Sequence, residues 1–306
     1  MRVRVLGSAA GGGFPQWNCG CPNCRGVRDR TIEATPRTQE SVAVSADGDG
    51  WFLLNASPEI RQQIEAFPPL HPRAARDTPI QAVVLTNGDL DHCLGLLSLR
   101  ESQPIAIYAT DSVRRGFTER NVFYRTLERF DGQVTWRRLV PGQPQDLLLA
   151  TGRPSGLTIE ARAVPGKPPI HLEQLEPSGP EDNVALRIRE AASGRQLSYA
   201  SAVGAITGAV RETLEGADCV FLDGTFWSAD ELIVGGLGDK RAEQMAHVPV
   251  GGADGSLAQL TGLAAARKLY IHVNNTNPML RDDSPQRAEA ERAGWRVASD
   301  GLELSL

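Results

Sequence analysis

Short apolar runs alternate with amphipathic segments along this chain of 306 residues. Buried strands of layered folds have this length and this enrichment in Val, Ile and Leu, so the runs predict strands. They cover residues 3–6, 51–55, 82–85, 105–108, 219–222 and 269–273. The amphipathic segments 59–67 and 206–215 suit helices that cover the faces of a sheet. The alternation therefore predicts a layered α/β fold.

The end of the chain predicts a helix followed by a strand. Ser284 can cap the helix, Pro285 suits its first position, and Gly294 closes it before the strand pattern at 295–298. Residues 164–180 contain five prolines, which cannot donate ladder hydrogen bonds, so we expect a long surface loop there. Such a loop either borders an active site or is a stiff connector, and both interpretations stay open. No Gly/Ser tract or charge block divides the chain, and a single domain, 1–306, is expected.

Charge and composition narrow the classes of partner and compartment. The 32 basic and 37 acidic residues give a formal net charge of -5 and form no basic stripe, so nucleic acid is not an expected partner. No apolar run approaches the roughly 20 residues that span a bilayer. The amino terminus enters a strand pattern without the apolar core and cleavage site of a signal peptide. Five cysteines, three of them close together, suit metal binding in a reducing compartment, and a cytoplasmic location is expected.

A candidate metal site follows the predicted strand 82–85. The loop Asn87-Gly88-Asp89-Leu90-Asp91-His92 ends in an adjacent carboxylate and imidazole. His272, near the end of another predicted strand, is the natural third ligand, because side chains at the ends of neighbouring strands converge. Two histidines and one carboxylate suit either Zn²⁺ with an activated water or Fe²⁺ with positions open for O₂ and substrate. Spacing does not choose between these ions, and a core histidine beside a helix-capping Asp91 is the alternative.

The loop resembles the metal-binding junction of the metallo-β-lactamase superfamily, His-x-His-x-Asp-His, whose first two histidines are here Asn87 and Asp89. Asn87 does not replace an imidazole well, and Asp89 is only a candidate ligand. The superfamily aspartate that bridges two ions falls at Ala202, which cannot bridge. His171 or Lys167 lies near the place of the remaining histidine, although His171 is equally well a solvated loop residue. These departures predict one ion rather than a dinuclear hydrolase.

Three cysteines, Cys19, Cys21 and Cys24, form a C-x-C-x-x-C cluster that predicts a structural zinc loop over about residues 18–25. A disulfide is the alternative, but the reducing compartment and the odd third thiol argue against it. Structural zinc has four ligands as a rule, and Asn275 is a candidate for the fourth through its weakly binding amide oxygen. Such a bond would tie the zinc loop to the strand that carries His272.

Four further residues are candidates either for a role at the site or for the core. A histidine in the region of His247 resembles a general acid of a related phosphodiesterase branch, so His247 is a candidate for proton transfer or substrate binding, with a solvated loop histidine as the alternative. Asp223, at the end of a predicted strand, is placed to orient a ligand. Cys93 and Cys219 lie in apolar runs and are expected to be small buried core residues.

Several long segments resemble the pyrroloquinoline quinone (PQQ) biosynthesis protein B family. They are residues 5–19, 55–58, 96–101, 223–227 and 271–278. The resemblance implies a metallo-β-lactamase-like αββα sandwich in which Asp91, His92 and His272 hold iron and the three clustered cysteines hold zinc. It further implies iron- and O₂-dependent hydroxylation of the tyrosine ring of a cross-linked Glu-Tyr intermediate from a precursor peptide.

Two other functions stay open at this point. One is a soluble carrier that moves PQQ or its precursor toward the periplasm, and the other is a zinc hydrolase that acts on a precursor fragment. A carrier needs a pocket but no ion with vacant coordination positions, so the predicted metal site favours an enzyme. Other PQQ-biosynthesis proteins are candidate partners, and a homodimer is left open.

Overall fold

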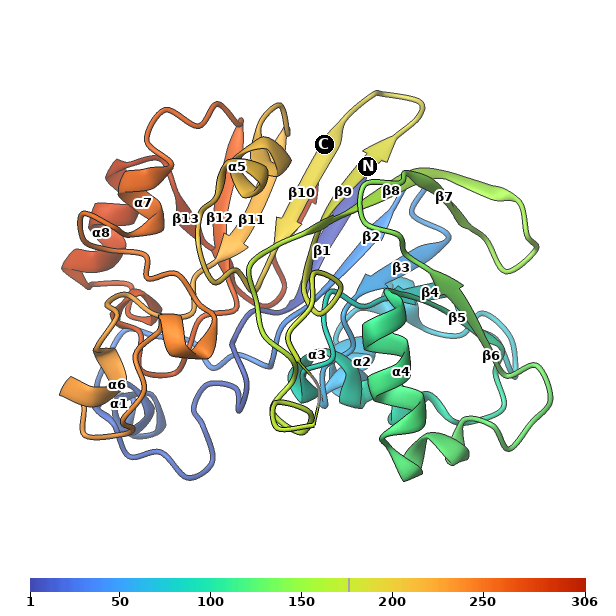
Figure 1. Ribbon diagram of the computed structural model, residues 1–306, viewed down its shortest axis with the longest axis horizontal. Helices are drawn as coiled ribbons and strands as arrows, with labels where there is room; N and C mark the ends of the chain where they lie inside the picture. The colour runs from blue at the N-terminus through green and yellow to red at the C-terminus, as the bar shows by residue number, and fades with distance from the viewer. Residues whose placement is uncertain (176) are drawn as a thin grey trace.

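Two seven-stranded sheets pack face to face, and helices cover their outer faces (Figure 1). The computed structural model describes residues 1–175 and 177–306. Position 176, which belongs to the predicted loop 164–180, lies outside the described residues. The layers confirm the predicted α/β class and the αββα arrangement.

The first sheet has the order β14-β1-β2-β3-β4-β5-β6. Its strands are β1 (Arg2–Gly7), β2 (Ser41–Ser45), β3 (Trp51–Leu54), β4 (Ile80–Val84), β5 (Ile105–Ala109), β6 (Val134–Arg138) and β14 (Glu303–Ser305). The strands from β3 to β6 run parallel, whereas β14, β1, β2 and β3 pair antiparallel. Parallel strands bring the ends of β3 and β4 to the same edge, which is where ligand sites form in α/β folds.

The second sheet has the order β13-β12-β11-β10-β9-β8-β7. Its strands are β7 (Gln145–Leu148), β8 (Pro154–Ala163), β9 (Val184–Glu190), β10 (Gln196–Ala200), β11 (Cys219–Asp223), β12 (Arg267–Ile271) and β13 (Arg296–Val297). Here β10, β11, β12 and β13 run parallel, and the other pairs are antiparallel. The two sheets therefore each contribute a set of parallel strand ends.

The helices lie between these strands in the chain. The α-helices are α1 (Pro22–Asp29), α2 (Ile60–Glu65), α3 (Leu90–Cys93), α4 (Asp111–Glu119), α5 (Gly208–Leu214), α6 (Glu231–Val234), α7 (Ser256–Gln259) and α8 (Pro285–Arg292). The 3₁₀ helices are η1 (Pro68–Leu70), η2 (Leu94–Leu99), η3 (Val122–Thr126), η4 (Glu243–Met245) and η5 (Pro278–Leu280). The predicted helix 59–67 corresponds to α2 and the predicted helix 206–215 to α5.

Three apolar clusters follow from the layered arrangement. The central cluster lies between the sheets and includes Phe52, Leu54, Tyr199 and Phe221 from strands of both. One outer cluster joins the first sheet to α2 and α4, and the other joins the second sheet to α5 and α8. Side chains alternate along a strand, so a strand between these layers buries both of its faces and reads as an apolar run.

Chain geometry at the predicted strand ends positions the candidate ligands. The predicted strand 269–273 ends at Ile271, because His272 adopts φ 58°, in the left-handed region.

The carboxyl-terminal helix is confirmed: Ser284 Oγ accepts a hydrogen bond of 3.1 Å from Arg287 N, and Pro285 opens α8. Gly294 follows the helix with φ 80°.

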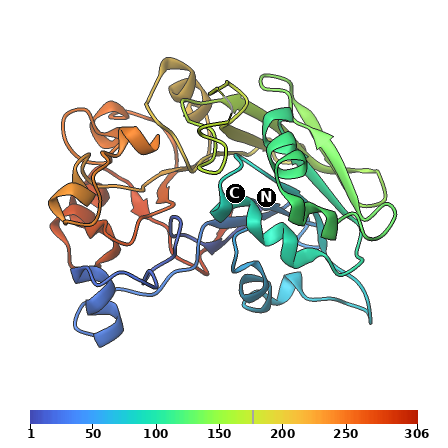
Figure 2. The ribbon, with the colours of Figure 1, turned by 60° about the horizontal axis from the view of Figure 1, so that its bottom comes forward.

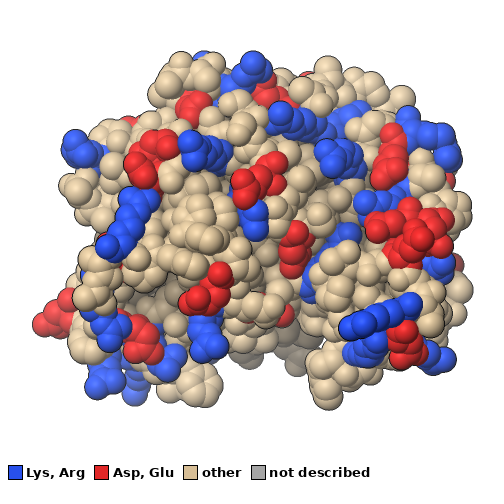
Figure 3. Space-filling model, turned by 180° about the vertical axis from the view of Figure 1, so that it is seen from behind, with Lys and Arg blue, Asp and Glu red and all other residues tan. Residues whose placement is uncertain are grey.

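The position of α1 and the distribution of charged side chains describe the outside of the sandwich. Helix α1 lies beside the carboxyl-terminal third of the chain in both ribbon views (Figures 1 and 2). Basic and acidic side chains are intermixed over the face in Figure 3, which shows no stripe of one sign. No helix among the described residues is long and apolar enough to cross a membrane.

Candidate metal centre

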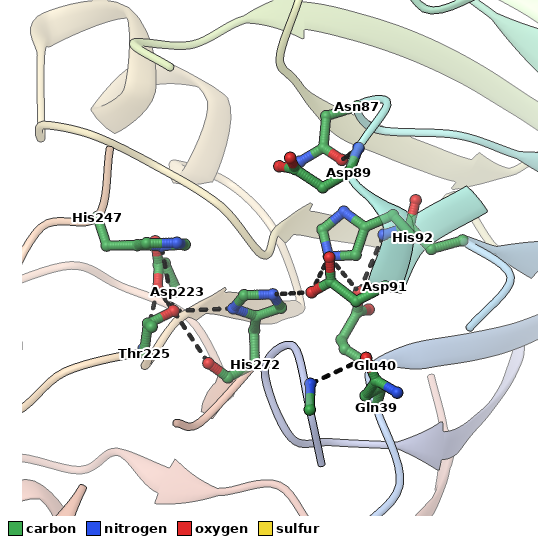
Figure 4. Close-up of polar contacts among 12 residues, drawn as sticks. Gln39, Glu40, Asn87, Asp89, Asp91, His92, Asp223, Thr225, His247 and His272 are labelled. Carbon is green, nitrogen blue, oxygen red and sulfur yellow. Dashed lines mark hydrogen bonds and ion pairs between the residues drawn. The ribbon is translucent and has the colours of Figure 1, made fainter. Parts of the chain in front are cut away.

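Asp91, His92 and His272 meet between the two sheets (Figure 4). Asp91 and His92 lie in the short helix α3 that follows β4, and His272 directly follows β12. Asp91 Oδ2 is 3.0 Å from His272 Nε2 and 3.8 Å from His92 Nε2. The structure thus brings the three predicted iron ligands to one point.

The chemistry of this cluster fits a bound cation. His92 is 1% exposed, and its Nε2 has no hydrogen-bond partner among the described residues. A buried polar atom normally has a partner, so an unpaired imidazole nitrogen beside a carboxylate indicates a missing ligand. Burial lowers the pKa of His92 to about 4, which keeps the imidazole neutral, so that one of its ring nitrogens carries a lone pair that can bind a metal ion.

Asp91 and His272 influence each other strongly. Burial opposes a charge on the imidazole, but the hydrogen bond and the negative charge of Asp91 raise the pKa of His272 to about 9. Burial likewise opposes the charge on Asp91, but a proton on His92 would lower the pKa of Asp91, and the hydrogen bond and charge of His272 hold it below its usual range. A proton or a metal ion on His272 Nε2 would stabilise the Asp91 carboxylate in the same way, so the two compete for this nitrogen.

Glu40 was missed by the sequence analysis. It is fully buried, and its Oε2 is 3.3 Å from His92 Nε2 and accepts a hydrogen bond of 2.9 Å from Asn55 Nδ2. Burial raises the pKa of Glu40 to about 8. Asn55 holds the loop after β4 as well, since its Oδ1 accepts hydrogen bonds from Thr86 N and Oγ1. The only sequence signal for Glu40 was an acidic residue immediately before the apolar stretch that forms β2.

A second polar group lies on the other side of the His272 ring (Figure 4). Asp223, at the end of β11, accepts four hydrogen bonds, of which two come from the backbone nitrogens of Val203 and Thr225 at 2.8 and 2.9 Å. The other two come from Thr225 Oγ1 and His247 Nδ1, both at 2.7 Å. Burial opposes ionisation, but the charge and hydrogen bond of His247 keep the pKa of Asp223 below its usual value.

His247 and His272 are stacked, with ring centroids 5.3 Å apart and planes inclined by 24°. The structure therefore brings Asp223 and His247, the two predicted catalytic residues, next to the candidate metal ligands. Asp223, His247 and His272 also have donor atoms close enough to form a metal cluster of their own. Since four hydrogen bonds already occupy the Asp223 carboxylate, we assign this group to orientation rather than to metal binding.

The positions that hold a second ion in the superfamily are arranged differently here. Asn87 Nδ2 donates to Asn183 Oδ1 at 3.2 Å, and Asn87 Oδ1 accepts from Asp89 N at 3.0 Å. Asp89 lies with Asn87, apart from the cluster of Asp91 and the two histidines, in Figure 4. Burial and the charge of Asp91 raise the pKa of Asp89 to about 6. Ala202, after β10, carries no donor atom.

The proline-rich loop lies against this second position. Asn183 Nδ2 donates to the backbone oxygen of Lys167 at 2.8 Å, so Asn183 links the loop to Asn87. A side chain on Gly88 would come within 3.2 Å of Pro169. Lys167 pairs with Glu173, and His171 is exposed. The described part of the loop thus borders the candidate site, which favours the first of the two interpretations given for it.

The three clustered cysteines lie together at the start of α1, and all are buried. The side-chain amide of Asn275 faces them, with Nδ2 3.2 Å from Cys19 Sγ, 3.8 Å from Cys21 Sγ and 3.3 Å from Cys24 Sγ. The two ends of an amide have nearly the same shape, so this side chain can present either its nitrogen or its oxygen to the cluster. Three convergent sulfur atoms with a polar cap fit a zinc ion.

Asn23 fastens the cysteine loop to the loop after His272. Its Nδ2 lies 3.2, 3.1 and 3.0 Å from the backbone oxygens of Asn275, Thr276 and Asn277. Hydrogen bonds therefore connect the cysteine loop to the loop after His272, and the predicted zinc bond through Asn275 stays a prediction. Cys93 is buried in the outer apolar cluster of the first sheet, and Cys219 is buried in the central cluster between the sheets, as expected.

Comparison with known proteins identifies the family of the chain. Residues 50–273 match the model of the beta-lactamase superfamily domain. The chain is 44% identical over 308 residues to coenzyme PQQ synthesis protein B of Azotobacter vinelandii, and 45% identical over 312 residues to that of Rhodopseudomonas palustris. Each of these comparisons covers 100% of both chains.

Solved structures extend the comparison to three dimensions. The Zn²⁺-bound PqqB from Methylobacterium extorquens is 41% identical and superimposes with a TM-score of 0.93, covering 100% of both chains. A diphosphatase from the PhnP family, 22% identical, has a TM-score of 0.66 over 100% of this chain and 97% of its own, and shares the fold. The chain thus belongs to the beta-lactamase superfamily and, within it, to the family of coenzyme PQQ synthesis protein B.

Proposed function

We propose that the protein acts in PQQ biosynthesis as an Fe²⁺- and O₂-dependent hydroxylase. Its substrate would be the cross-linked Glu-Tyr intermediate derived from the precursor peptide, hydroxylated on the tyrosine ring. The names of the full-length relatives support the pathway. The arrangement of Asp91, His92 and His272 supports the reaction class, because two imidazoles and one carboxylate are the ligand set of non-haem iron oxygenases.

The observation that carries the proposal is the imbalance between the two superfamily metal positions. One position has three convergent ligands. At the other, Asn87 is bound to Asn183, Ala202 has no donor, and Asp223 is saturated by hydrogen bonds. A dinuclear hydrolase requires a hydroxide that bridges two ions, and the second position here lacks the ligands to hold the second ion. A single ion with vacant coordination positions suits a reaction that must bring O₂ and substrate together.

Iron bound at this position would supply the one-electron and O₂ chemistry that amino-acid side chains lack. In the overall reaction, one atom of O₂ replaces a ring hydrogen as hydroxyl and the other leaves as water. Two electrons and two protons are consumed for each oxygen inserted, so the reaction needs an external two-electron reductant such as ascorbate. These requirements define the assay mixture.

The protein contributes proton transfer and orientation. His247 Nδ1 donates to Asp223, so Nε2 is the ring atom available to exchange a proton with the substrate. We assign His247 the role of catalytic acid or base toward the phenol, and Asp223 the role of fixing its tautomer. The hydrogen bond to Asp223 fixes the orientation of the His247 ring.

The cysteine cluster is assigned a structural role. Zinc held by Cys19, Cys21 and Cys24, with Asn275 at the fourth position, would join α1 to the loop that follows His272. The zinc ion of the Methylobacterium relative is consistent with zinc binding in this family. Delivery of the substrate by another PQQ-biosynthesis protein, a homodimeric state and a cytoplasmic location stay predictions.

The proposal is tested by turnover. Protein loaded anaerobically with Fe²⁺ is mixed with a tyrosine-containing, cross-linked substrate and ascorbate, and O₂ is then admitted. We expect O₂ consumption and a ring-hydroxylated product over several turnovers. Stoichiometric binding of PQQ without turnover would favour the carrier, and cleavage of the substrate by Zn²⁺-loaded protein in the absence of O₂ would favour the hydrolase.

A further inference from the structure

The hydroxyl group of Thr225 lies at the centre of the polar network behind His272. Thr225 is 2% exposed and follows β11 by two residues. Its Oγ1 is 2.7 Å from Asp223 Oδ1, 2.8 Å from His272 Nδ1, 3.0 Å from His272 O and 3.1 Å from His247 Nδ1. Four polar atoms thus surround one hydroxyl group that has a single proton to donate.

The Thr225 hydroxyl group can donate its proton to only one acceptor at a time. The Asp223 carboxylate and the His272 carbonyl can only accept, so the hydroxyl can serve one of them. The contact with Asp223 is shorter, and a bond to a charged acceptor is the stronger of the two. The Thr225 proton therefore points to Asp223, and the lone pairs of Oγ1 face the two histidine rings.

The imidazole rings of His247 and His272 differ in whether their Nδ1 proton is directed to Thr225 Oγ1. His247 Nδ1 is 2.7 Å from Asp223 Oδ2, shorter than its 3.1 Å contact with Thr225, so its proton goes to the carboxylate. His272 Nδ1 has Oγ1 as its partner at 2.8 Å. A lone pair on Oγ1 at that distance requires a proton on His272 Nδ1. The hydrogen bonds that link Asp223, Thr225 and His272 then have one consistent set of donors and acceptors.

We infer that Thr225 is a positioning residue that holds His272 in the tautomer protonated on Nδ1, so that the lone pair of Nε2 points at the metal position beside Asp91. Ligating histidines commonly donate their second ring N–H to a fixed acceptor, which orients the ring and raises its basicity. The inference rests on the metal site of the proposed function, but concerns a residue that contacts neither the metal position nor substrate.

The local backbone is fixed by bonds that do not involve this hydroxyl group. Gly224 N donates to Ile271 O at 2.8 Å, and Asn274 N donates to Thr225 O at 3.0 Å. Asn277 Nδ2 bonds to the backbone oxygens of Gly224 and Thr225 at 2.9 and 3.3 Å. Removing only the hydroxyl should therefore change the ring of His272 more than the path of the chain, which makes Thr225→Val an informative substitution.

Metal affinity tests the inference. Co²⁺ is titrated into protein whose active site has been stripped with a chelator, and its visible absorption reports binding. We expect Thr225→Val to bind about 10- to 100-fold more weakly, as other losses of an outer partner do, and Thr225→Ser to keep most of the affinity. Thr213→Val is the matched control, because Thr213 is a buried threonine whose hydroxyl donates to Ala209 O within α5.

The result that would overturn the inference is wild-type Co²⁺ affinity in Thr225→Val, or equal losses in the valine and serine variants. Asp91→Ala distinguishes a failure of the Thr225 inference from a failure of the proposed function. If Asp91→Ala keeps the wild-type affinity for Co²⁺, the assignment of the metal site itself is wrong. A direct measurement needs no variant at Thr225. Two-bond ¹H–¹⁵N correlation spectra of the Zn²⁺-loaded wild-type chain, with His272 identified by His272→Gln, should show the proton on Nδ1, and a proton on Nε2 would contradict the inference.

Discussion

Asp91 Oδ2 and His272 Nε2 lie 3.0 Å apart although 181 positions separate them in the chain. The first residue follows a strand of one sheet and the second follows a strand of the other. The contact therefore spans the junction between the two sheets. A cation held by this pair and by His92 would join the two halves of the sandwich, which couples metal binding to the stability of that junction.

His92→Ala is expected to abolish iron binding at the active site and leave the zinc of the cysteine cluster in place, because it removes a buried ring nitrogen that makes no hydrogen bond among the described residues and lies beside the Asp91 carboxylate. Elemental analysis of the purified variant measures both metals. His71→Ala is the control, since His71 is a surface histidine whose ring contacts the backbone oxygen of Glu65. Unchanged iron content in His92→Ala would refute the assignment.

Cys21→Ser is expected to lose zinc and to lower Tm by at least about 5 °C, the shift that a loss of about 2 kcal/mol produces in a chain of this order of size. The reason is that metal binding to a folded site contributes free energy to folding. Cys219→Ala, which removes a buried thiol from β11, should keep its zinc. Full thermal stability of zinc-free Cys21→Ser would show that the cluster is not structural.

His247→Gln is expected to keep iron and lose activity. The imidazole bonds to Asp223 and is assigned to proton transfer, whereas the iron ligands are elsewhere. Loss of a general acid or base lowers a rate by about 10²- to 10⁴-fold. Steady-state kinetics with iron quantified in the same samples make the comparison, and His171→Gln on the exposed loop serves as control. An equal loss of iron and activity would instead place His247 among the ligands.

The buried carboxyl group of Glu231 is expected to make the free energy of unfolding depend on pH. Burial raises its pKa from 4.5 to about 7, and Trp227 N donates to its carboxylate at 2.7 Å. The folded protein therefore binds this proton more tightly than the unfolded chain, and the free energy of unfolding falls as pH rises from about 4.5 to about 7. Glu231→Gln removes this loss, so its Tm relative to wild type should be higher at pH 8 than at pH 4.5.

Thermal unfolding at the two pH values makes this comparison, with Glu243→Gln as a control that changes an exposed carboxylate. The same Tm difference between Glu231→Gln and wild type at both pH values would contradict the assignment. Glu231 also bonds to Thr276 in the loop after His272, so the measurement reports how firmly α6 is attached beside the candidate site.

The sequence predicted those parts of the fold in which burial leaves a continuous apolar run. Strands β3, β4, β5, β11 and β12 were all anticipated in this way. Strand β9 was not, because Arg187 and Arg189 alternate with the buried Leu186 and Ile188 and interrupt the apolar run. An alternating pattern of this kind is a weaker signal than an apolar run.

The candidate site was predicted only where its residues carry recognisable chemistry, either near a predicted strand end or in a closely spaced cluster or loop. Asp91, His92, His272 and the cysteines met that condition, and the structure brings each set together. Glu40 and Thr225 did not, since their roles depend on contacts with residues distant in the sequence: Glu40 contacts His92, and Thr225 contacts His272, 47 positions away. Such roles arise from tertiary packing, which spacing along the chain does not encode.

The origin of the oxygen atom in the product tests the central claim most directly. Fe²⁺-loaded protein, substrate and ascorbate are incubated under ¹⁸O₂ in ordinary water, and the product is examined by mass spectrometry. A hydroxylase that uses O₂ places one ¹⁸O atom in each new ring hydroxyl group. A product whose added oxygen comes from water, or a failure of the Fe²⁺-loaded protein to form hydroxylated product, would contradict the account.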